Sequence, residues 1–238
     1  MKKLVCVVLS VCMLLSTGIL NALAAEDVTI TTIFADDFES YDDDANIPFK
    51  AATLNSWSAG ARSSTSTVKA YKDGDNMVLR LANSADKSGG PRADKHLYLA
   101  NVNNLTLSFR AKSVDAKFSV TMTMPDGKTR LAYTDTERDW IAYAFEFDFA
   151  KGIYNVYENG ELTKSELEIT GTDKTEVKFE FSTQGIFAGQ EVFYDDIQFT
   201  TTDAVDVDSI STGKVATRTP EEILAAGQKM YAELSAET

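Results

Sequence analysis

The sequence predicts an all-β protein in which two antiparallel sheets pack face to face, followed by a short C-terminal α-helix. Three observations support this fold class. Apolar and polar residues alternate with a period of two from Ile30 to Phe199, as expected for strands with one buried face. Turn sequences separate these segments at short intervals. No helical periodicity interrupts the region, which disfavours a parallel sheet with crossover helices.

The first 24 residues have the pattern of a secretory signal peptide. Lys2 and Lys3 form a positive start, an apolar run extends from Leu4 to Leu20, and Ala22-Leu23-Ala24 is a small-residue cleavage signal. The apolar run is short and interrupted by polar residues and glycine, which disfavours a membrane anchor. We therefore expect a secreted protein, extracellular or associated with the cell wall, with no membrane insertion after cleavage.

Charge and cysteine content restrict the partners that the exported chain can have. Both cysteines, Cys6 and Cys12, leave with the signal, so the mature chain cannot form a disulfide and needs a large core or a metal. The net charge is −13, and removal of Lys2 and Lys3 takes it to −15. Such an acidic chain is not expected to bind nucleic acid or polyanionic glycans, because both require clustered cations. Neutral polymers and divalent cations fit better.

Four alternating stripes predict half-buried strands whose apolar side chains face inward. They are Leu105, Leu107, Phe109 and Ala111; Phe118, Val120, Met122 and Met124; Ile141, Tyr143, Phe145, Phe147 and Phe149; and Val177, Phe179 and Phe181. The pair Asn159-Gly160 stands between Ile153–Glu158 and Glu161–Thr163 and predicts a hairpin, since both residues tolerate the positive φ of a type I′ turn. We expect these strands to form one sandwich of the jelly-roll type over residues 26–202.

The pattern changes after Thr202. Residues 203–218 are polar and predict a linker. Thr219-Pro220-Glu221-Glu222 combines a capping box with proline at the first helical position, and a narrow apolar stripe continues over 219–236. The sequence therefore predicts a short C-terminal helix that docks on the sandwich or on a protein partner.

Two similar segments, Phe34–Ser40 and Phe193–Phe199, lie near the ends of the predicted sandwich. Each has the pattern of a strand with an acid, Asp36 or Asp195, among its inward-facing positions. A buried carboxylate is costly unless it is protonated, paired or bound to a cation. If the first and last strands are neighbours, Asp36 and Asp195 would hold one metal ion, and oxygen ligands favour a structural calcium ion. The alternative is that these acids pair with Lys or Arg.

With these motifs identified, the chain resembles the concanavalin A-like lectin/glucanase superfamily, particularly its laminin-G-like and carbohydrate-binding-module branches in secreted bacterial proteins. The likeness is carried by Asp36–Tyr41 with Trp57 following, by Tyr154–Leu162, and by Tyr194–Phe199. The resemblance covers the region from Ile30 to Thr202. It implies a jelly-roll fold, a role in carbohydrate recognition and, as in several relatives, a calcium ligand on the last strand.

The enzymatic branch of this superfamily is less similar. Its retaining glucanases carry a Glu-x-Asp-x-x-Glu strand that supplies a nucleophile and a general acid. The nearest match here is Glu146-Phe147-Asp148, and the third acid is missing because Ala150 and Lys151 follow. The only histidine, His96, lacks the context of a lyase site. The sequence therefore favours a non-catalytic module, and Glu146 and Asp148 are expected on a solvated strand face.

A carbohydrate site needs an exposed aromatic ring that stacks on a sugar, flanked by groups that hydrogen-bond. Trp140 meets this requirement, because its position places it opposite the Ile141–Phe149 stripe and beside small residues. The alternative is a ring tucked under a loop at the strand start. Arg110 lies on the outward face of its strand, and Tyr133 and Arg92 are expected in loops that border the site.

Together these features predict a non-catalytic, extracellular carbohydrate-binding module with a structural calcium site and a neutral polysaccharide as partner. Two alternatives from other classes stay open. One is a glycan hydrolase or lyase that uses other acids. The second is a structural or adhesion module that binds protein, with the C-terminal helix as its docking element.

Overall fold

The computed structural model of the protein describes residues 29–48, 57–60, 63–86, 88–133, 138–183, 186–207 and 210. The predicted signal peptide (1–24) and the predicted helix (219–236) lie outside the described residues, as does most of the predicted linker (203–218). Within the described residues the strands are β1 (Thr31–Asp36), β2 (Ser58–Gly60), β3 (Ser66–Asp73), β4 (Asn76–Asn83), β5 (Arg92–Leu97), β6 (Asn104–Val114), β7 (Phe118–Met124), β8 (Gly127–Tyr133), β9 (Arg138–Asp148), β10 (Ile153–Glu158), β11 (Glu161–Glu168), β12 (Val177–Thr183) and β13 (Glu191–Thr201).

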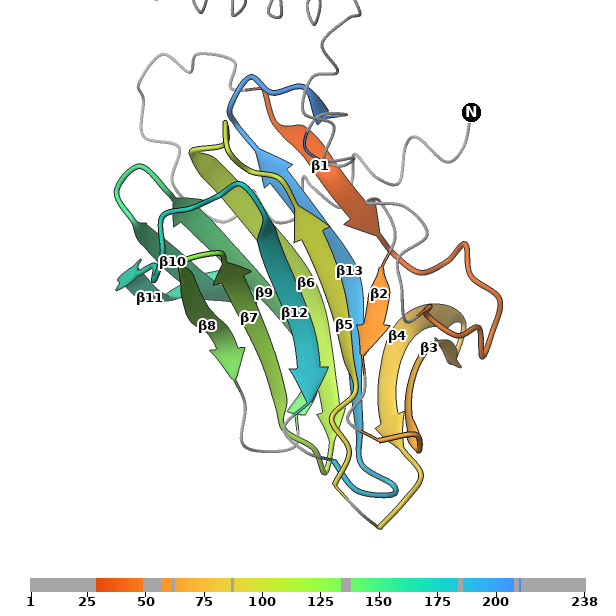
Figure 1. The fold of residues 1–238 in the computed structure, drawn as a ribbon. Coiled ribbons are helices and arrows are strands. Elements are labelled where there is room, and N and C mark those ends of the chain that lie inside the picture. The colour runs from red at the N-terminus through yellow and green to blue at the C-terminus, as the bar shows by residue number, and fades with distance from the viewer. Residues whose placement is uncertain are drawn as a thin grey trace, which may run out of the picture.

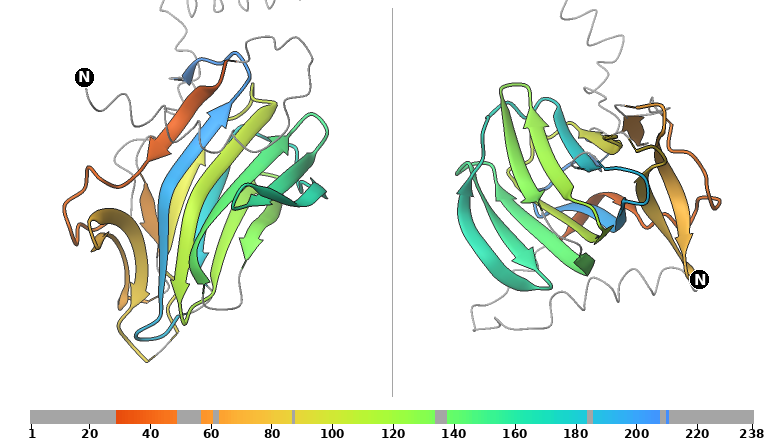
Figure 2. Two further views of the ribbon diagram at one scale, coloured as in Figure 1. Left: turned by 180° about the vertical axis from the view of Figure 1, so that it is seen from behind. Right: turned by 90° about the horizontal axis from the view of Figure 1, so that it is seen from below.

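The strands form two antiparallel sheets that pack as a sandwich, which confirms the predicted fold class (Figure 1). One sheet has eight strands in the order β11-β10-β9-β6-β13-β4-β3, with β1 also paired to β13. The other has five strands in the order β2-β5-β12-β7-β8. The views in Figure 2 show the sheets as two layers. The first and last strands are neighbours, as the sequence predicts.

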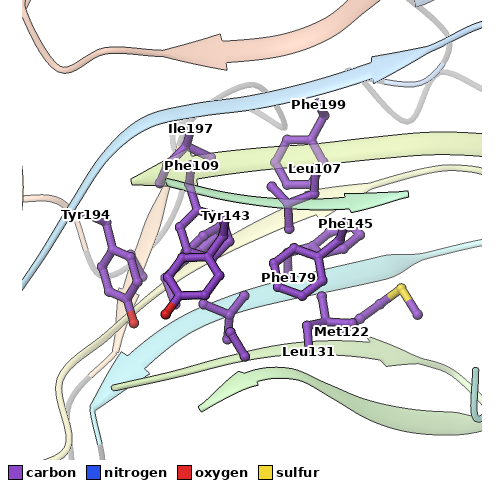
Figure 3. Close-up of a cluster of buried hydrophobic side chains, with 14 of the residues drawn as sticks. Leu107, Phe109, Met122, Leu131, Tyr143, Phe145, Phe179, Tyr194, Ile197 and Phe199 are labelled. Atoms are coloured by element: carbon purple, nitrogen blue, oxygen red, sulfur yellow. The ribbon is translucent and has the colours of Figure 1, made fainter. Parts of the chain in front are cut away.

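Aromatic side chains from both sheets fill the space between them (Figure 3). The Phe109 ring stacks on Tyr143 in the same sheet and meets Phe181 of the other sheet edge to face, with both centroid distances 5.4 Å. Phe179 and Phe199 join the two sheets at 4.7 Å. The stripes predicted for β6, β7, β9 and β12 all face this core. Burial of so many rings provides the large core that a mature chain without disulfides needs.

The hairpin predicted around Asn159-Gly160 is confirmed. Glu158 pairs with Glu161 across a two-residue loop. Asn159 and Gly160 have φ values of 51° and 83°, as a type I′ turn requires at both central positions. This turn returns the chain into β11, the edge strand of the eight-stranded sheet.

A bulge divides β13 into two halves that have different neighbours. Residues 191–194 pair with β4, whereas residues 197–201 pair with β1, and β6 runs along the other side of both halves. The register with β6 shifts between Asp195 and Gln198, and Asp196 adopts a φ of 50°. Because a bulge adds one residue to a strand, side chains after it point to the opposite face from the one that simple alternation predicts. Tyr194 and Ile197 therefore both face the core, and Asp195 faces outward.

Trp57 is buried at one end of the core, and the inward-facing acid Asp36 lies beside it. The Trp57 indole N–H donates to Asp36 Oδ2 at 2.8 Å, and the Tyr41 hydroxyl donates to the same oxygen at 3.2 Å. The Phe38 backbone N–H donates to Asp36 Oδ1 at 2.9 Å. Burial raises the pKa of Asp36 above its ordinary value, and these three donors partly offset the effect.

A lysine on the opposite sheet shares this end of the core. Lys95 is fully buried, and its Nζ lies 3.5 Å from the centroid of the Phe34 ring. Its charge interacts with that of Asp36, which supports the ammonium form, but burial dominates and lowers the pKa of Lys95 to about 8. Asp36 therefore has a buried cation as its electrostatic partner, the alternative to a metal that the sequence left open.

The chain stays on the sandwich beyond Thr202. The Asp203 carboxylate accepts hydrogen bonds from the backbone N–H groups of Asn103 and Asn104, at 2.5 and 2.8 Å. Ile210 is 4% exposed and belongs to the core. The first residues of the predicted linker thus pack on the sandwich. No helix among the described residues is long and apolar enough to cross a membrane.

The buried lysine leads to a prediction about pH. Because the pKa of Lys95 is about 8 when folded and 10.5 as the reference, the folded protein binds fewer protons than the unfolded chain between these values. The free energy of unfolding is therefore expected to rise by about 1 kcal/mol between about pH 8 and pH 9, before tyrosines, with an ordinary pKa of about 10, ionise to a large extent. Urea unfolding at a series of pH values measures this rise.

The matched control is Lys95→Met, which keeps a long apolar side chain in place but cannot titrate. It should lose the rise while remaining folded. An equal pH dependence in both proteins would show that another group is responsible.

Candidate functional site

Trp140 and Arg110 meet on the outer face of the eight-stranded sheet, the face turned away from the core. Trp140 is the third residue of β9, and Arg110 on β6 pairs with Ala142 two residues further along. The Arg110 guanidinium carbon lies 5.2 Å from the centroid of the Trp140 ring, and Lys112 Nζ lies 5.9 Å from it. Two cations thus hold the partly exposed indole ring on the sheet. This confirms that Trp140 and Arg110 share the outward face.

The guanidinium of Arg110 is itself held by two acids of the β13 bulge. Its Nη2 donates to Asp195 Oδ2, and its Nε lies 2.7 Å from Asp196 Oδ2. Asp195 is 1% exposed and also accepts from the Asn76 side-chain amide at 2.8 Å. Burial raises the pKa of Asp195, and the neighbouring Asp196 carboxylate acts in the same direction. The bulge therefore positions Arg110, and Arg110 in turn positions Trp140.

A row of alternating aromatic and cationic side chains continues across this face. Phe193 on β13 pairs with Lys112 on β6 and with Arg80 on β4. Lys112 Nζ lies 5.4 Å from the Phe193 ring, and Arg80 lies 4.7 Å from the Tyr71 ring. Sequence reasoning missed Tyr71, which the alternation of β3 would have placed outward. It also assigned Phe193 to the core, because the bulge that separates it from Ile197 has no signature in the sequence.

A groove of about 310 Å³ lies at the other end of the same face. It is lined by Ile30, Asn104, Leu105, Thr106, Glu146, Phe147, Asp148, Asn155, Thr200, Thr201 and Thr202. The strand register places Asn104, Thr106, Glu146, Asp148, Asn155 and Thr200 on the outward face of β6, β9, β10 and β13. Amide, hydroxyl and carboxylate groups therefore converge in the groove, and such groups bind ligand hydroxyls.

Glu146 and Asp148 share the outward face, as the sequence predicts. Glu146 Oε2 accepts a hydrogen bond from the Tyr157 hydroxyl at 2.7 Å. Asp148 Oδ2 lies 2.8 Å from Lys151 Nζ, and hydrogen bonds from Lys151 lower the pKa of Asp148. A general acid for glycoside cleavage needs a raised pKa. Asp148 is therefore suited to accept hydrogen bonds rather than to donate a proton.

Arg92 and Tyr133 both lie in strands instead of the loops predicted for them, and Arg92 is on the opposite sheet from Trp140. Arg92 begins β5 and Tyr133 ends β8, in the five-stranded sheet on the other side of the core. Arg92 Nε lies 3.3 Å from Asp94 Oδ2 and 3.9 Å from Glu180 Oε2. The Tyr133 backbone pairs with Ser119, and its side chain lies outside the described part of the chain. The prediction of Arg92 as a rim residue was wrong, because a local pattern does not show which strands become neighbours, and the prediction for Tyr133 stays untested.

The pair Asp36 and Asp195 does not come together, although β1 and β13 are neighbours. The β13 bulge turns Asp195 to the outer face, whereas Asp36 points into the core. Each carboxylate has its own protein donors: Trp57 and Tyr41 for Asp36, and Arg110 and Asn76 for Asp195. The geometry thus separates the two ligands predicted to share a calcium ion. Over the described ranges, no three His, Cys, Asp or Glu side chains gather as a metal site.

Comparisons with known proteins give distant structural likenesses. No protein-family model matches the chain, and neither does any curated protein. Among solved structures, a putative sugar binding protein from Bacteroides thetaiotaomicron is 13% identical, with a TM-score of 0.47 over 72% of this chain and 100% of that one. The CBM22-1 xylan-binding domain from Paenibacillus barcinonensis is 16% identical, with a TM-score of 0.39 over 74% and 97%.

A sialidase is also similar, at 12% identity and a TM-score of 0.47, over 72% of this chain. This chain spans about a fifth of the sialidase, 19% of its length. Carbohydrate-binding modules are the kind of protein that the sequence motifs resemble, and they appear among these structures. At these identities and TM-scores the likeness carries no argument about ligand or activity.

The separate partners of the two acids lead to a prediction about metal removal. We expect the melting temperature of the mature protein to be the same with calcium and with a chelator. Asp195→Ala should lower the melting temperature by about 4–8 °C in both conditions, because loss of the buried acceptor leaves Asn76 without this partner and Arg110 with Asp196 alone, at a cost of about 2 kcal/mol.

Asp196→Ala is the matched control, because its carboxylate is 55% exposed. It should change the melting temperature much less. A wild-type melting temperature that falls on chelation would instead support the calcium site predicted from the sequence.

Proposed function

We propose that the protein is a non-catalytic extracellular carbohydrate-binding module of the jelly-roll type, which binds a neutral polysaccharide on the outer face of its eight-stranded sheet. The observation that carries the proposal is the Trp140 ring fixed by Arg110 and Lys112 on an outward face. An amphipathic ring held in this way offers a rigid surface for the C–H face of a sugar at little cost in conformational entropy.

The strand geometry provides a path from this ring to the polar groove. β9 runs from Trp140 to Glu146 over about 20 Å, at roughly 3.3 Å for each residue. The outward side chains between them are small, namely Ala142 and Ala144 on β9 and Ser108 on β6. Such a flat track accommodates an extended chain of several sugar rings. Stacking at Trp140 would then combine with hydrogen bonds in the groove.

Charge supports a neutral ligand on this face. The cations near Trp140 are compensated, since Arg110 is paired with Asp195 and Asp196 and Lys112 lies 3.2 Å from Asp73 Oδ2. The groove adds carboxylates at its far end. An anionic polysaccharide would meet these acids without free cations to offset them. The hydroxyl groups of a neutral glycan can both donate and accept hydrogen bonds, at the Trp140 end of this face and in the groove.

The proposal is tested by glycan-array binding of the mature protein and of Trp140→Ala. We expect the wild type to bind one or more neutral polysaccharides and the variant to bind them about tenfold more weakly, since loss of one stacking contact removes about 1.4 kcal/mol. Phe187→Ala is the matched control, because this ring is 46% exposed in the loop before β13 and does not stand on a strand of the proposed binding face. The control should bind like the wild type.

Three results would contradict the proposal. Equal binding by Trp140→Ala and the wild type would show that the ring does not contact the glycan. Release of reducing ends or unsaturated products from the bound polysaccharide would indicate a hydrolase or lyase. Silence on the array, together with a protein partner that is lost when residues 219–238 are deleted, would favour the adhesion alternative.

A further inference from the structure

Ile30 contributes an exposed apolar side chain to the polar groove on the eight-stranded sheet. The residue is 48% exposed, and it lines the groove together with amide, hydroxyl and carboxylate groups. It directly precedes β1, whose first residue, Thr31, pairs with Thr201 of β13. Leu162 and Phe187 are the other large apolar side chains exposed among the described residues, and neither lines the groove. The groove therefore offers a ligand an apolar contact that is open to solvent, in addition to hydrogen bonds.

Two polar side chains of β6 share the groove with Ile30. Asn104 pairs with Asp148 of β9, and Thr106, two residues further along β6, pairs with Glu146. Asn104 donates through Nδ2 to Asp203 Oδ1 at 2.9 Å, so the amide atom that it offers to a ligand is the acceptor Oδ1. Thr106 offers a hydroxyl group, which can donate. Both side chains belong to one face of β6, about 6.6 Å apart along the strand.

The carboxylates of the groove already have partners within the protein. Glu146 Oε2 accepts from the Tyr157 hydroxyl at 2.7 Å, and Asp148 Oδ2 lies 2.8 Å from Lys151 Nζ. A cationic ligand group would have to replace these partners, which favours a neutral group in the groove. The groove thus presents such a group with an acceptor, a donor and an apolar surface.

An acetamido group matches these three features. It is planar, with its N–H and C=O on opposite edges and a methyl group at its end. With a hydrogen bond of about 2.9 Å on each edge, it fits between an acceptor and a donor that are about 7–8 Å apart. This is close to the spacing of two outward residues along a strand, about 6.6 Å. The methyl group covers apolar surface, which a hydroxyl group does not do.

We propose that the groove takes the acetamido group of an N-acetylated sugar, with its N–H on Asn104 Oδ1, its carbonyl on the Thr106 hydroxyl and its methyl group against Ile30. This assignment rests on the proposed function, because it names the substrate class of the same face. The ligand is then a neutral polysaccharide that contains N-acetylhexosamine units. One ring of the chain stacks on Trp140, and a ring further along β9 places its acetamido group in the groove.

The test compares synthetic oligosaccharides in two pairs of equal length and linkage. One pair consists of glucose and N-acetylglucosamine oligomers, and the other of galactose and N-acetylgalactosamine oligomers. Titration calorimetry of the mature protein measures each affinity. We expect the acetylated member of at least one pair to bind about tenfold more tightly, as one buried methyl group and one added hydrogen bond would give. Equal or weaker binding of the acetylated member in both pairs would overturn the acetamido site.

Two variants test the contacts. Ile30→Ser should reduce the affinity for the acetylated oligomer about fivefold and leave that for its partner unchanged, since only the acetylated ligand uses the apolar contact. Thr106→Val keeps the shape of the side chain, removes the donor and should also reduce the preference. Leu162→Ser is the matched control, because it removes a side chain that is 54% exposed on the edge strand β11, outside the groove. A preference that is the same in the two variants and the control would show that the groove does not hold the acetamido group.

Trp140→Ala separates the acetamido site from the proposed function. It should weaken both members of a pair equally, so that the preference remains. Weaker binding by Trp140→Ala without any preference for acetylated oligomers would support the proposed function and overturn the acetamido site. A preference that is lost in Ile30→Ser, with binding unchanged in Trp140→Ala, would support the acetamido site and contradict stacking at Trp140. No binding of any of the four oligomers would overturn the acetamido site and leave the proposed function to other neutral polysaccharides.

Discussion

The bulge in β13 is the constraint on which the rest of the eight-stranded sheet depends. It lies where the strand exchanges β4 for β1 as its neighbour, and it lets Tyr194 and Ile197 both enter the core. The residue that it displaces, Asp195, turns outward to hold Arg110 and Asn76. One extra residue in β13 thereby lets this strand pair with β1, β4 and β6. It also places a polar cluster on the face opposite the core.

The structure satisfies its buried acids with protein donors. Asp36 accepts from Trp57 and Tyr41 at the end of the core, and the buried cation of Lys95 lies close to it. Asp195 uses an arginine and an amide on the outside of the sheet. The sandwich thus gains cross-links between distant segments from charge-assisted hydrogen bonds and aromatic packing. Each such interaction requires both partners. Removal of one leaves the other buried without a partner, which destabilises the folded state.

The outer faces of the two sheets carry different arrangements of aromatic and charged side chains. On the eight-stranded sheet, cations hold an aromatic ring, and small side chains lead to a polar groove. On the five-stranded sheet, Asp94 pairs with Arg92 and Glu180 pairs with Lys178. The first arrangement favours stacking on an extended chain.

The sequence by itself determined the fold class, the inward stripes of β6, β7, β9 and β12, the hairpin at Asn159-Gly160 and the outward position of Trp140 and Arg110. These follow from alternation and turn chemistry, which are local properties of the chain. Only the tertiary structure decided the direction of Asp195, because a bulge at the non-glycine residue Asp196 reverses the alternation without a sequence signal. It also decided that Arg92 and Tyr133 lie on the opposite sheet from Trp140. Which strands become neighbours depends on long-range pairing, and no local pattern specifies it.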